Sequence, residues 1–530
     1  FMHIKHIPLK INGKLDKDAL PSPNYLNTVR DIILPRNIRE QMIYESFATI
    51  LNLQHLQWSI DDDFFEYGGT SILAICLVYR LQGHLAVNIA DIFKYRTVRL
   101  LAENLPLGLH SISQKLDLIK DLYRNIDPKI KQNNQQCPKY IDKYLQNAKQ
   151  LIFTKFTLKP IKNVLVTGTP GFLGCHLVYE LLTSTDYNVY LLVRGDSEQT
   201  ASNRLEKQFR HYLGDEFELF NNYSSRLSLL CSSLDQDNLG LTTIVYENLI
   251  TQIDSVIHSA ALVKHYGNYK EFYTHNVQST INLLKFTGQT QLKDFHYIST
   301  YSVLQATHNA KSDKLIYTED CIPSVDITCD STYVHTKLLG EHEVIISRQL
   351  GLNANIYRIG NLAYRAKNYQ LPYNIEDNAF FNTLCYIKHT GKFVKELSNF
   401  EISPVDITAN AIIKLFNKAE LNKSTYHVFN PHKFNLTQAD IRRLNIKRVS
   451  LNDFIEDLNR NLENNEFTLK FILRQGWFSS IEDIKSNLDV NILQTKTELV
   501  LKQLDFTWPE ITSGEFACYA KSKLDKYFIN

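Results

Sequence analysis

The order of hydrophobic and polar positions divides the chain into two regions with different patterns. Within residues 26–108, apolar side chains recur at helical spacing over 38–51 and 72–81, which predicts a small helical domain. From residue 159 onward, short apolar runs alternate with longer amphipathic stretches. Alternating strands and helices predict an α/β Rossmann-type domain with a doubly wound parallel sheet.

The apolar runs and the amphipathic stretches between them locate individual elements of the second domain. The expected strands are 163–167, 188–193, 227–231, 255–258, 295–299 and 355–358, and the clearest helices are 173–182 and 276–286. The domain extends over 159–530, and we expect its more helical C-terminal part to form a smaller substrate subdomain. Residues 109–158 are polar and charged, and we interpret them as a linker and an N-terminal extension of this domain.

Composition and charge narrow the possible functions. The 530 residues carry 58 Lys and Arg against 56 Asp and Glu, and this balance argues against nucleic acid as the main partner. The 8 cysteines form no Cys-x-x-Cys pair and no zinc-spaced cluster with histidine, so we expect free thiols and no metal. The first residues lack the apolar core of a signal peptide, and the longest apolar run is too short to span a membrane. We expect a cytoplasmic protein cut from a longer polypeptide.

Residues 61–74 contain a candidate attachment site. Gly68 and Gly69 precede Ser71, which opens a predicted helix whose N-terminus favours a phosphate. The alternative is a plain helix N-cap. The string Asp-Asp-Asp-Phe-Phe-Glu-Tyr-Gly-Gly-Thr-Ser resembles the phosphopantetheine attachment motif of peptidyl carrier proteins. The resemblance implies a four-helix carrier domain over 26–108, with 4′-phosphopantetheine placed on Ser71 by a phosphopantetheinyl transferase.

The N-terminal segment carries a second resemblance. Residues 8–16, Pro-Leu-Lys-Ile-Asn-Gly-Lys-Leu-Asp, are similar to the closing motif of the adenylation domains of nonribosomal peptide synthetases. Residues 1–25 would then be a remnant of such a domain, and Lys14 would be inert. The implied partners are upstream synthetase domains of the same polypeptide.

A glycine-rich turn follows the first predicted strand of the second domain. Glycines in such a turn let the backbone approach a pyrophosphate, whose charge the helix N-terminus stabilises. Gly-x-x-Gly-x-x-Gly spacing resembles that of extended short-chain dehydrogenase/reductases. The candidate cofactor residues at and near the turn are Gly168, Thr169, Gly171, Phe172, Leu173, Gly174 and, after a later strand, Ala260.

The strand after the turn ends in Arg194, where an arginine suits the 2′-phosphate of NADP and an acid would suit NAD. Arg204 on the following helix could reach the same phosphate, so we expect NADPH as the cofactor. Ser233 stands where the family has an aspartate that helps bind adenine, which puts that contact in doubt. We interpret His258 as a packed core histidine and Asn276 as a structural residue.

The sequence Tyr333-Val-His-Thr-Lys337 is a candidate catalytic pair. On a helix, residues four apart share a face, and a nearby cation lowers the pKa of a phenol, which makes it a usable acid. Lys337 would also bind the nicotinamide ribose. Alignment to the family by Ser302 puts Thr300 at the position of the third catalytic hydroxyl, with Ser299 as the alternative.

Together these motifs resemble the carrier and terminal thioester reductase domains of nonribosomal peptide synthetases. The resemblance implies reductive release of an acyl or peptidyl thioester with NADPH, as an aldehyde or an alcohol. Three alternatives stay open: a non-redox release domain of the Dieckmann type, a nucleotide-sugar epimerase or dehydratase, and a non-catalytic module that only docks the loaded carrier. The presence of both Tyr333 and Lys337 favours redox chemistry.

Overall fold

The computed structural model describes two stretches of the chain, residues 32–105 and 141–512. Within them, the residues not described are 54–57, 82–84, 86, 154, 196, 219–221, 265–267, 290–292, 306–314, 324–330, 376–377, 395–398, 433, 436–441, 443–444, 451, 455 and 458–489. The predicted adenylation remnant and most of the predicted linker therefore lie outside the described residues.

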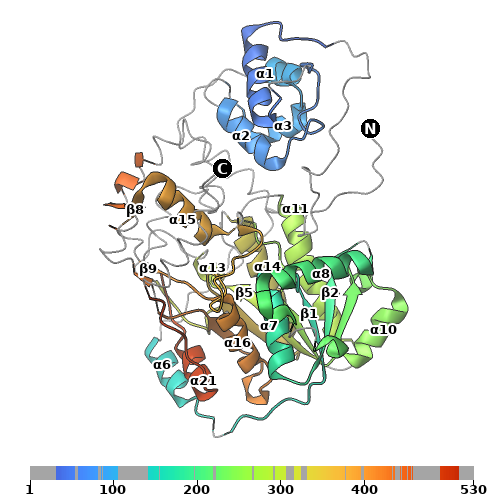
Figure 1. Cartoon of the computed structure of the whole chain (residues 1–530), viewed down its shortest axis with the longest axis vertical. Helices are drawn as coiled ribbons and strands as arrows, with labels where there is room; N and C mark the ends of the chain where they lie inside the picture. The colour runs from blue at the N-terminus through green and yellow to red at the C-terminus, as the bar shows by residue number, and fades with distance from the viewer. Residues whose placement is uncertain are drawn as a thin grey trace.

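The first stretch is a helical domain (Figure 1), and its buried apolar side chains form a core of their own. Its helices are α1 (Ile38–Leu51), α2 (Ser71–Leu81), α3 (Ile89–Tyr95) and α4 (Val98–Asn104). The rings of Phe47 and Phe64 meet edge to face with centroids 5.0 Å apart, and Trp58 stacks on Phe47 at 5.8 Å. All three side chains are buried, so these aromatic rings fix how the helices pack around one another. The predicted four-helix domain is confirmed.

The second stretch is built on a seven-stranded sheet in which all the described pairings are parallel. The strand order is β10-β7-β5-β4-β1-β2-β3. The strands are β1 (Asn163–Thr167), β2 (Asn188–Val193), β3 (Leu227–Cys231), β4 (Ser255–His258), β5 (Asp294–Thr300), β7 (Ala354–Ile359) and β10 (Thr425–Val428). The doubly wound parallel sheet is confirmed, and the strand order reverses beside β1, between β1 and β4. In open sheets of this kind, ligands bind outside the carboxyl ends of the strands at such a reversal.

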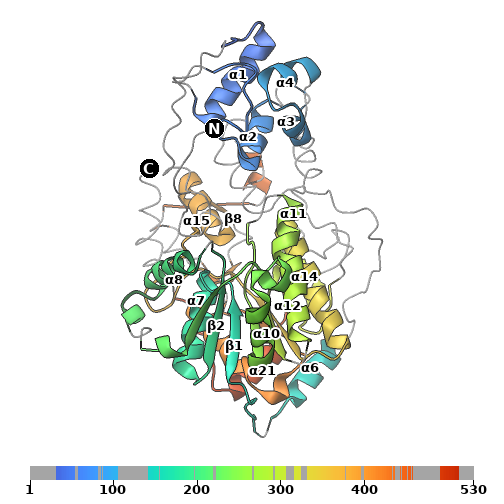
Figure 2. The same ribbon diagram turned by 90° about the vertical axis from the view of Figure 1, so that its right-hand side faces the viewer.

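Helices cover both faces of the sheet (Figure 2), so its central strands are apolar on both sides. Val164 and Val166 of β1 pack in the core of one face, while Leu165 packs in the core of the other. The first face is covered by α7 (Phe172–Ser184), α8 (Glu198–Leu213), α16 (Val405–Phe416) and α21 (Thr495–Gln503), and the second by α10 (Thr243–Gln252), α12 (Ser279–Thr287) and α14 (Thr332–Gln349).

The helix expected at 276–286 begins earlier and is not regular. It starts as α11 (Tyr269–Phe272), continues as the π-helix η5 (Tyr273–Gln278) and then becomes α12. Asn276 therefore lies inside the π-helical turn and does not open a helix. Such turns occur frequently at functional sites.

The C-terminal part of the chain contributes to two places. A separate core that includes Tyr364, Phe381 and Phe393 lies around α15 (Ala379–Thr390) and β8 (Lys392–Val394). The short pairs are β8 with β12 (Lys447–Val449) and β9 (Asn399–Phe400) with β11 (Phe434–Asn435). In contrast, α21 returns to the core of the main sheet through Val500 and Leu501.

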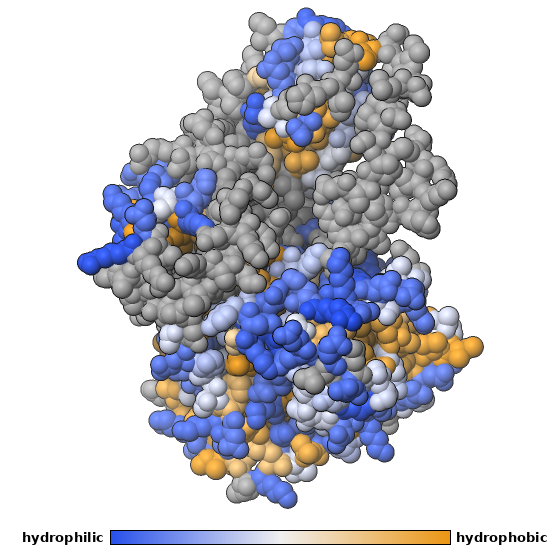
Figure 3. Space-filling model, in the orientation of Figure 1, coloured by the Kyte–Doolittle hydropathy of each residue, from blue (hydrophilic) through white to orange (hydrophobic). Residues whose placement is uncertain are grey.

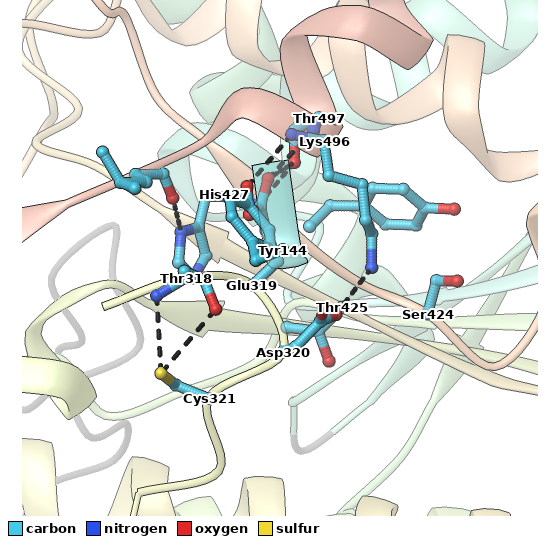
Figure 4. Close-up of polar contacts among 12 residues, drawn as sticks. Tyr144, Thr318, Glu319, Asp320, Cys321, Ser424, Thr425, His427, Lys496 and Thr497 are labelled. Atoms are coloured by element: carbon cyan, nitrogen blue, oxygen red, sulfur yellow. Dashed lines mark hydrogen bonds and ion pairs between the residues drawn. The ribbon is translucent and has the colours of Figure 1, made fainter. Parts of the chain in front are cut away.

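The helix α6 (Ile141–Gln150), in the predicted N-terminal extension, packs against α21 (Figure 4). Tyr144 donates a hydrogen bond to the buried carboxylate of Glu319 and accepts one from the Lys496 backbone N–H at 3.1 Å. Thr497 donates to the other Glu319 oxygen through both its backbone N–H and its hydroxyl, each at 2.9 Å. Buried polar contacts thus attach α6 to the sheet domain.

The described surface is mostly polar in the view of Figure 3, with an apolar area over α10, where Ile244 is 73% exposed. No described helix combines the length and the hydrophobicity needed to cross a bilayer. The described residues also contain no group of three or more His, Cys, Asp or Glu side chains arranged to hold a metal ion.

Candidate active site

Ser71, the predicted attachment residue, lies at the start of α2, after a turn that requires glycine. Gly68 has a φ of +93°, and a Cβ on Gly69 would overlap the ring of Phe64. Thr70 makes the capping contact, because its hydroxyl accepts a hydrogen bond from the backbone N–H of Leu73 at 3.3 Å. Ser71 is exposed at the first turn. The capping role that was the alternative for Ser71 therefore belongs to its neighbour.

The three glycines of the turn after β1 are needed for close backbone packing. Gly168 has a φ of +74°, and a Cβ there would lie 2.6 Å from the backbone nitrogen of Ala260. A Cβ on Gly174 would lie 2.7 Å from the carbonyl carbon of Gly168, and a Cβ on Gly171 would lie 2.9 Å from the carbonyl oxygen of Gly168. Side chains here would push the turn away from α7 and from the segment after β4.

The turn also leaves hydrogen-bond donors available to an anion. Gly171 is the N-cap of α7 and provides no side-chain hydrogen bond, so the first backbone N–H groups of the helix are uncapped. The buried hydroxyl of Thr169 has no hydrogen-bond partner among the described residues. Phe172 packs its ring on His176, and Leu173 is buried, so these two residues contribute backbone to the turn. These features fit a pyrophosphate.

Two arginines lie together at the end of β2. Arg194 is exposed, and Arg204 on α8 donates a hydrogen bond to its carbonyl oxygen at 3.1 Å. Burial and then the charge of Arg194 lower the pKa of Arg204. The Arg204 Nε has no hydrogen-bond partner among the described residues. Two neighbouring arginines, one of which has an Nε–H without a described acceptor, fit a phosphate monoester, such as the 2′-phosphate of NADP.

The residues after β3 differ from the family pattern at the adenine position. The Ser233 hydroxyl donates to Asp235 at 3.1 Å, so a carboxylate lies next to the position where the family has its aspartate. The hydroxyl of Ser232 is buried and lacks a hydrogen-bond partner within the described part of the chain. The sequence reasoning singled out neither Ser232 nor Asp235 as a functional residue.

The segment after β4 is held by buried polar side chains. His258 lies between the hydroxyls of Thr167, at 2.8 Å, and Thr280, at 3.0 Å, and burial lowers its pKa to about 3. The Asn276 side chain accepts from the Leu262 N–H at 2.7 Å and donates to the Leu262 carbonyl at 3.2 Å. Both residues are structural, as predicted, and they fix the backbone that contains Ala260.

Tyr333 and Lys337 lie one turn apart on α14, which packs against β5. Tyr333 is half-buried and packs in the cluster of Val303 and Leu304, which follow β5. The Lys337 ammonium donates to the carbonyl of Ile298 at 2.6 Å and lies 4.0 Å from the centre of the Tyr297 ring. The pair therefore lies beside the carboxyl end of β5.

The expected effect of Lys337 on the phenol is wrong for this structure. Burial raises the pKa of Tyr333, and it lowers the pKa of Lys337 to about 7 although the Glu341 carboxylate raises that value. The reason is that each side chain is shielded from water, Lys337 more completely than the half-buried Tyr333, which disfavours the charged form of each. Tyr333 stays protonated near neutral pH and can act as a proton donor.

The two candidate hydroxyls at the end of β5 have different surroundings. Ser299 donates to the buried carboxylate of Glu341 at 2.7 Å, so its hydroxyl is committed to that contact. The Thr300 hydroxyl contacts its neighbour Ser302, with 3.3 Å both to the hydroxyl and to the backbone N–H. This geometry favours Thr300 as the third hydroxyl beside Tyr333.

Comparison with known proteins adds the family context. Residues 166–412 match the NAD-binding family described as male sterility protein, and residues 41–105 match the family described as phosphopantetheine attachment site. A thiolation-reductase di-domain from an archaeal non-ribosomal peptide synthetase is similar in structure. Its TM-score is 0.66 at 27% sequence identity, covering 94% of this chain and 99% of that chain.

Two curated relatives are much longer than this chain. A linear gramicidin synthase of Brevibacillus parabrevis is 25% identical over 532 residues, which cover 98% of this chain and 10% of that protein. The L-2-aminoadipate reductase of Eremothecium gossypii is 30% identical in its large subunit over 324 residues, covering 58% of this chain and 23% of that protein. The chain thus spans less than a quarter of the length of either relative.

Proposed function

Because the chain joins a domain of the phosphopantetheine attachment family to an NAD-binding domain of the male sterility protein family, we propose that it reductively releases a thioester carried on Ser71. The observation that carries the proposal is that both domains occur within one chain. Ser71 is exposed at the start of a helix that Thr70 caps. The glycine turn follows the carboxyl end of β1, and Tyr333 and Lys337 lie on α14, which packs against β5 of the same sheet.

The side chains at the end of β5 and on α14 account for the chemistry of release. When bound, NADPH supplies the hydride and the pantetheine arm supplies the thioester. Negative charge develops on the carbonyl oxygen, which the hydroxyls of Thr300 and Tyr333 stabilise by hydrogen bonds. Tyr333 gives its proton to that oxygen. The carbon–sulfur bond then breaks, which frees the thiol and leaves an aldehyde, and a second reduction would give the alcohol.

The choice of NADPH rests on the paired arginines. Arg194 and Arg204 place two guanidinium groups at the end of β2, and the spare Nε of Arg204 suits an added phosphate. Tethering on Ser71 raises the local concentration of the substrate carbonyl at the site. The other domains of a synthetase would supply the acyl or peptidyl group, and a phosphopantetheinyl transferase would install the arm. We infer a cytoplasmic monomer acting inside such an assembly.

The test loads Ser71 with an acyl-pantetheine and follows NADPH absorbance together with the released product. We expect NADPH to be consumed as aldehyde or alcohol appears, and NADH to be used poorly. Tyr333→Phe should bind NADPH but release no product, because it keeps the ring and loses the proton donor. Ser71→Ala should bind NADPH and release nothing, because it cannot be loaded.

The same assay separates the rival functions. Release of the acyl group without NADPH consumption would identify a non-redox release domain. NADPH binding with no release from any of several acyl groups would favour a non-catalytic docking module. The ratio of NADPH consumed to acyl group released distinguishes two-electron from four-electron reduction.

A further inference from the structure

A buried carboxylate lies below the candidate catalytic pair, on the same face of α14. Tyr333, Lys337 and Glu341 follow one another at intervals of four residues, so they align along the helix. Glu341 is fully buried. A carboxylate in such a place is costly unless charge and hydrogen bonds compensate it, so its contacts indicate what it is for.

Glu341 receives hydrogen bonds from two strands at the same level of the sheet. Ser299 of β5 and Arg358 of β7 are directly paired in register. Ser299 donates to one Glu341 oxygen at 2.7 Å, and the Arg358 Nε donates to the other at 3.1 Å. Burial opposes ionisation of the carboxyl, but Arg358 and Ser299 outweigh it and lower the pKa of Glu341. Glu341 is therefore a carboxylate at neutral pH.

Arg358 is itself held on every side. Besides Glu341, it donates to the Cys321 carbonyl at 2.9 Å and contacts the His427 Nε2 at 3.2 Å. The Nδ1 of His427 lies 2.6 Å from the Leu493 carbonyl, so that nitrogen carries the proton and Nε2 accepts from Arg358. The guanidinium is rigid, and Glu341 is rigid with it.

We propose that Glu341 is a positioning residue of the reductase, which holds the end of β5 through Ser299 and supports the ammonium of Lys337 through its charge. Thr300 directly follows Ser299, so this contact fixes the backbone from which the Thr300 hydroxyl projects. The ammonium lies against Ile298 and the Tyr297 ring, within the same short stretch of β5. The proposal rests on the proposed function, because it assigns its role to that catalytic set.

The charges around Lys337 explain why Glu341 matters for its protonation. The titratable groups that face it are Tyr297 on β5, His258 on β4, and Tyr333 and Glu341 on its own helix. Burial keeps the two phenols and the imidazole neutral near pH 7, since it raises the pKa of the tyrosines and lowers that of the histidine. Glu341 is the charged member of this set, and its carboxylate opposes the loss of the Lys337 proton.

The experiment compares three variants of the full chain by the pH dependence of kcat/KM and of NADPH affinity. Glu341→Gln should move the loss of activity on raising the pH to a lower pH, because the carboxylate no longer supports the ammonium. Glu341→Asp keeps the charge and should restore the wild-type pH dependence. Ser299→Ala keeps the ion pair, so it should leave the pH dependence unchanged and lower kcat by about tenfold through displacement of Thr300.

Each result decides one part of the proposal. A folded Glu341→Gln with a wild-type pH profile would overturn the role of the charge, and a wild-type kcat in Ser299→Ala would overturn the positioning of Thr300. If Glu341→Gln does not fold, Ser299→Ala still decides the positioning of Thr300, and a shifted pH profile in Glu341→Asp, which retains the charge beside Arg358, would overturn the role of the charge. If the wild-type protein binds NADPH but reduces no thioester, the proposed function is refuted. The pH dependence of NADPH affinity then tests separately whether the Glu341 carboxylate supports the Lys337 ammonium.

Discussion

The contact between α6 and the sheet domain can be tested by removing one oxygen atom. Tyr144 is 5% exposed, and its hydroxyl bridges the Glu319 carboxylate and the Lys496 backbone N–H. Tyr144→Phe keeps the ring in place and removes both contacts. The substitution should therefore measure the hydrogen bonds without creating a large cavity.

The structure sets the size of the expected effect. Glu319 is 1% exposed, and its second oxygen keeps both hydrogen bonds from Thr497 in the variant. The loss is one hydrogen bond to a buried carboxyl group, together with the acceptor of one backbone N–H. Losses of this kind cost about 2–3 kcal/mol in total. Burial already raises the pKa of Glu319, and Tyr144 opposes that rise, so the variant should protonate this carboxyl at higher pH.

The assay is urea unfolding of the full chain, with hydrogen exchange of the α6 and α21 amides as the local readout. The matched control is Tyr373→Phe, at a side chain that is 37% exposed. We expect the control to stay within about 0.5 kcal/mol of wild type. A Tyr144→Phe variant that matches this control in both measurements would refute the reasoning, because it would mean that α6 is held by its apolar contacts alone.

Three further changes test the cofactor site and the protonation of the catalytic pair. Gly174→Ala should abolish NADPH binding in fluorescence titrations, because its Cβ would lie 2.7 Å from the carbonyl carbon of Gly168. Replacing both Arg194 and Arg204 by alanine should weaken NADPH by at least about tenfold more than NADH, because charge-assisted contacts to the added phosphate are lost. In wild type, kcat/KM should fall as the pH rises above about 7, where the buried Lys337 loses its proton.

Each of these predictions has a control or a contrary outcome. Gly288→Ala adds a Cβ that would lie 3.6 Å from its nearest neighbour, so it should bind NADPH normally. Equal losses of NADPH and NADH in the double arginine variant would show that the arginines do not read the phosphate. A flat profile between pH 6 and pH 9 would contradict the low pKa of Lys337, whereas Tyr333 cannot produce the predicted fall because burial raises its pKa.

The sequence predicted the parts of the fold that depend on local pattern. The strands expected at 163–167 and 188–193 agree with β1 and β2, since a strand buried on both faces appears as a continuous apolar run. Strand β10 was not predicted, because Thr425–Val428 is short and contains His427. That histidine is buried as a neutral acceptor for Arg358, and the hydrophobic pattern of the sequence cannot reveal such a partner.

In the candidate site, too, features set by local sequence were predicted, and features set by distant partners were not. The glycine turn and the Tyr333–Lys337 spacing are local, so the sequence located both on the elements that contain them. The sequence already favoured Thr300 over Ser299 by alignment, and the structure adds a physical reason, because the Ser299 hydroxyl donates to a carboxylate on another element. Glu341 could have been noticed by its spacing of four from Lys337, but its partners come from two strands that only folding brings together.

Charge pairing distinguishes residues that bind from residues that hold the fold. Arg358 is buried and bound by a carboxylate, a carbonyl and an imidazole, so it has no capacity left for a ligand. Arg194 and Arg204 have no carboxylate partner among the described residues, although they repel each other at the edge of the sheet. Holding two like charges together is unfavourable unless an anion joins them. The sheet therefore neutralises Arg358 inside the fold and leaves Arg194 and Arg204 without a carboxylate partner among the described residues, which is the arrangement that the proposed 2′-phosphate contact needs.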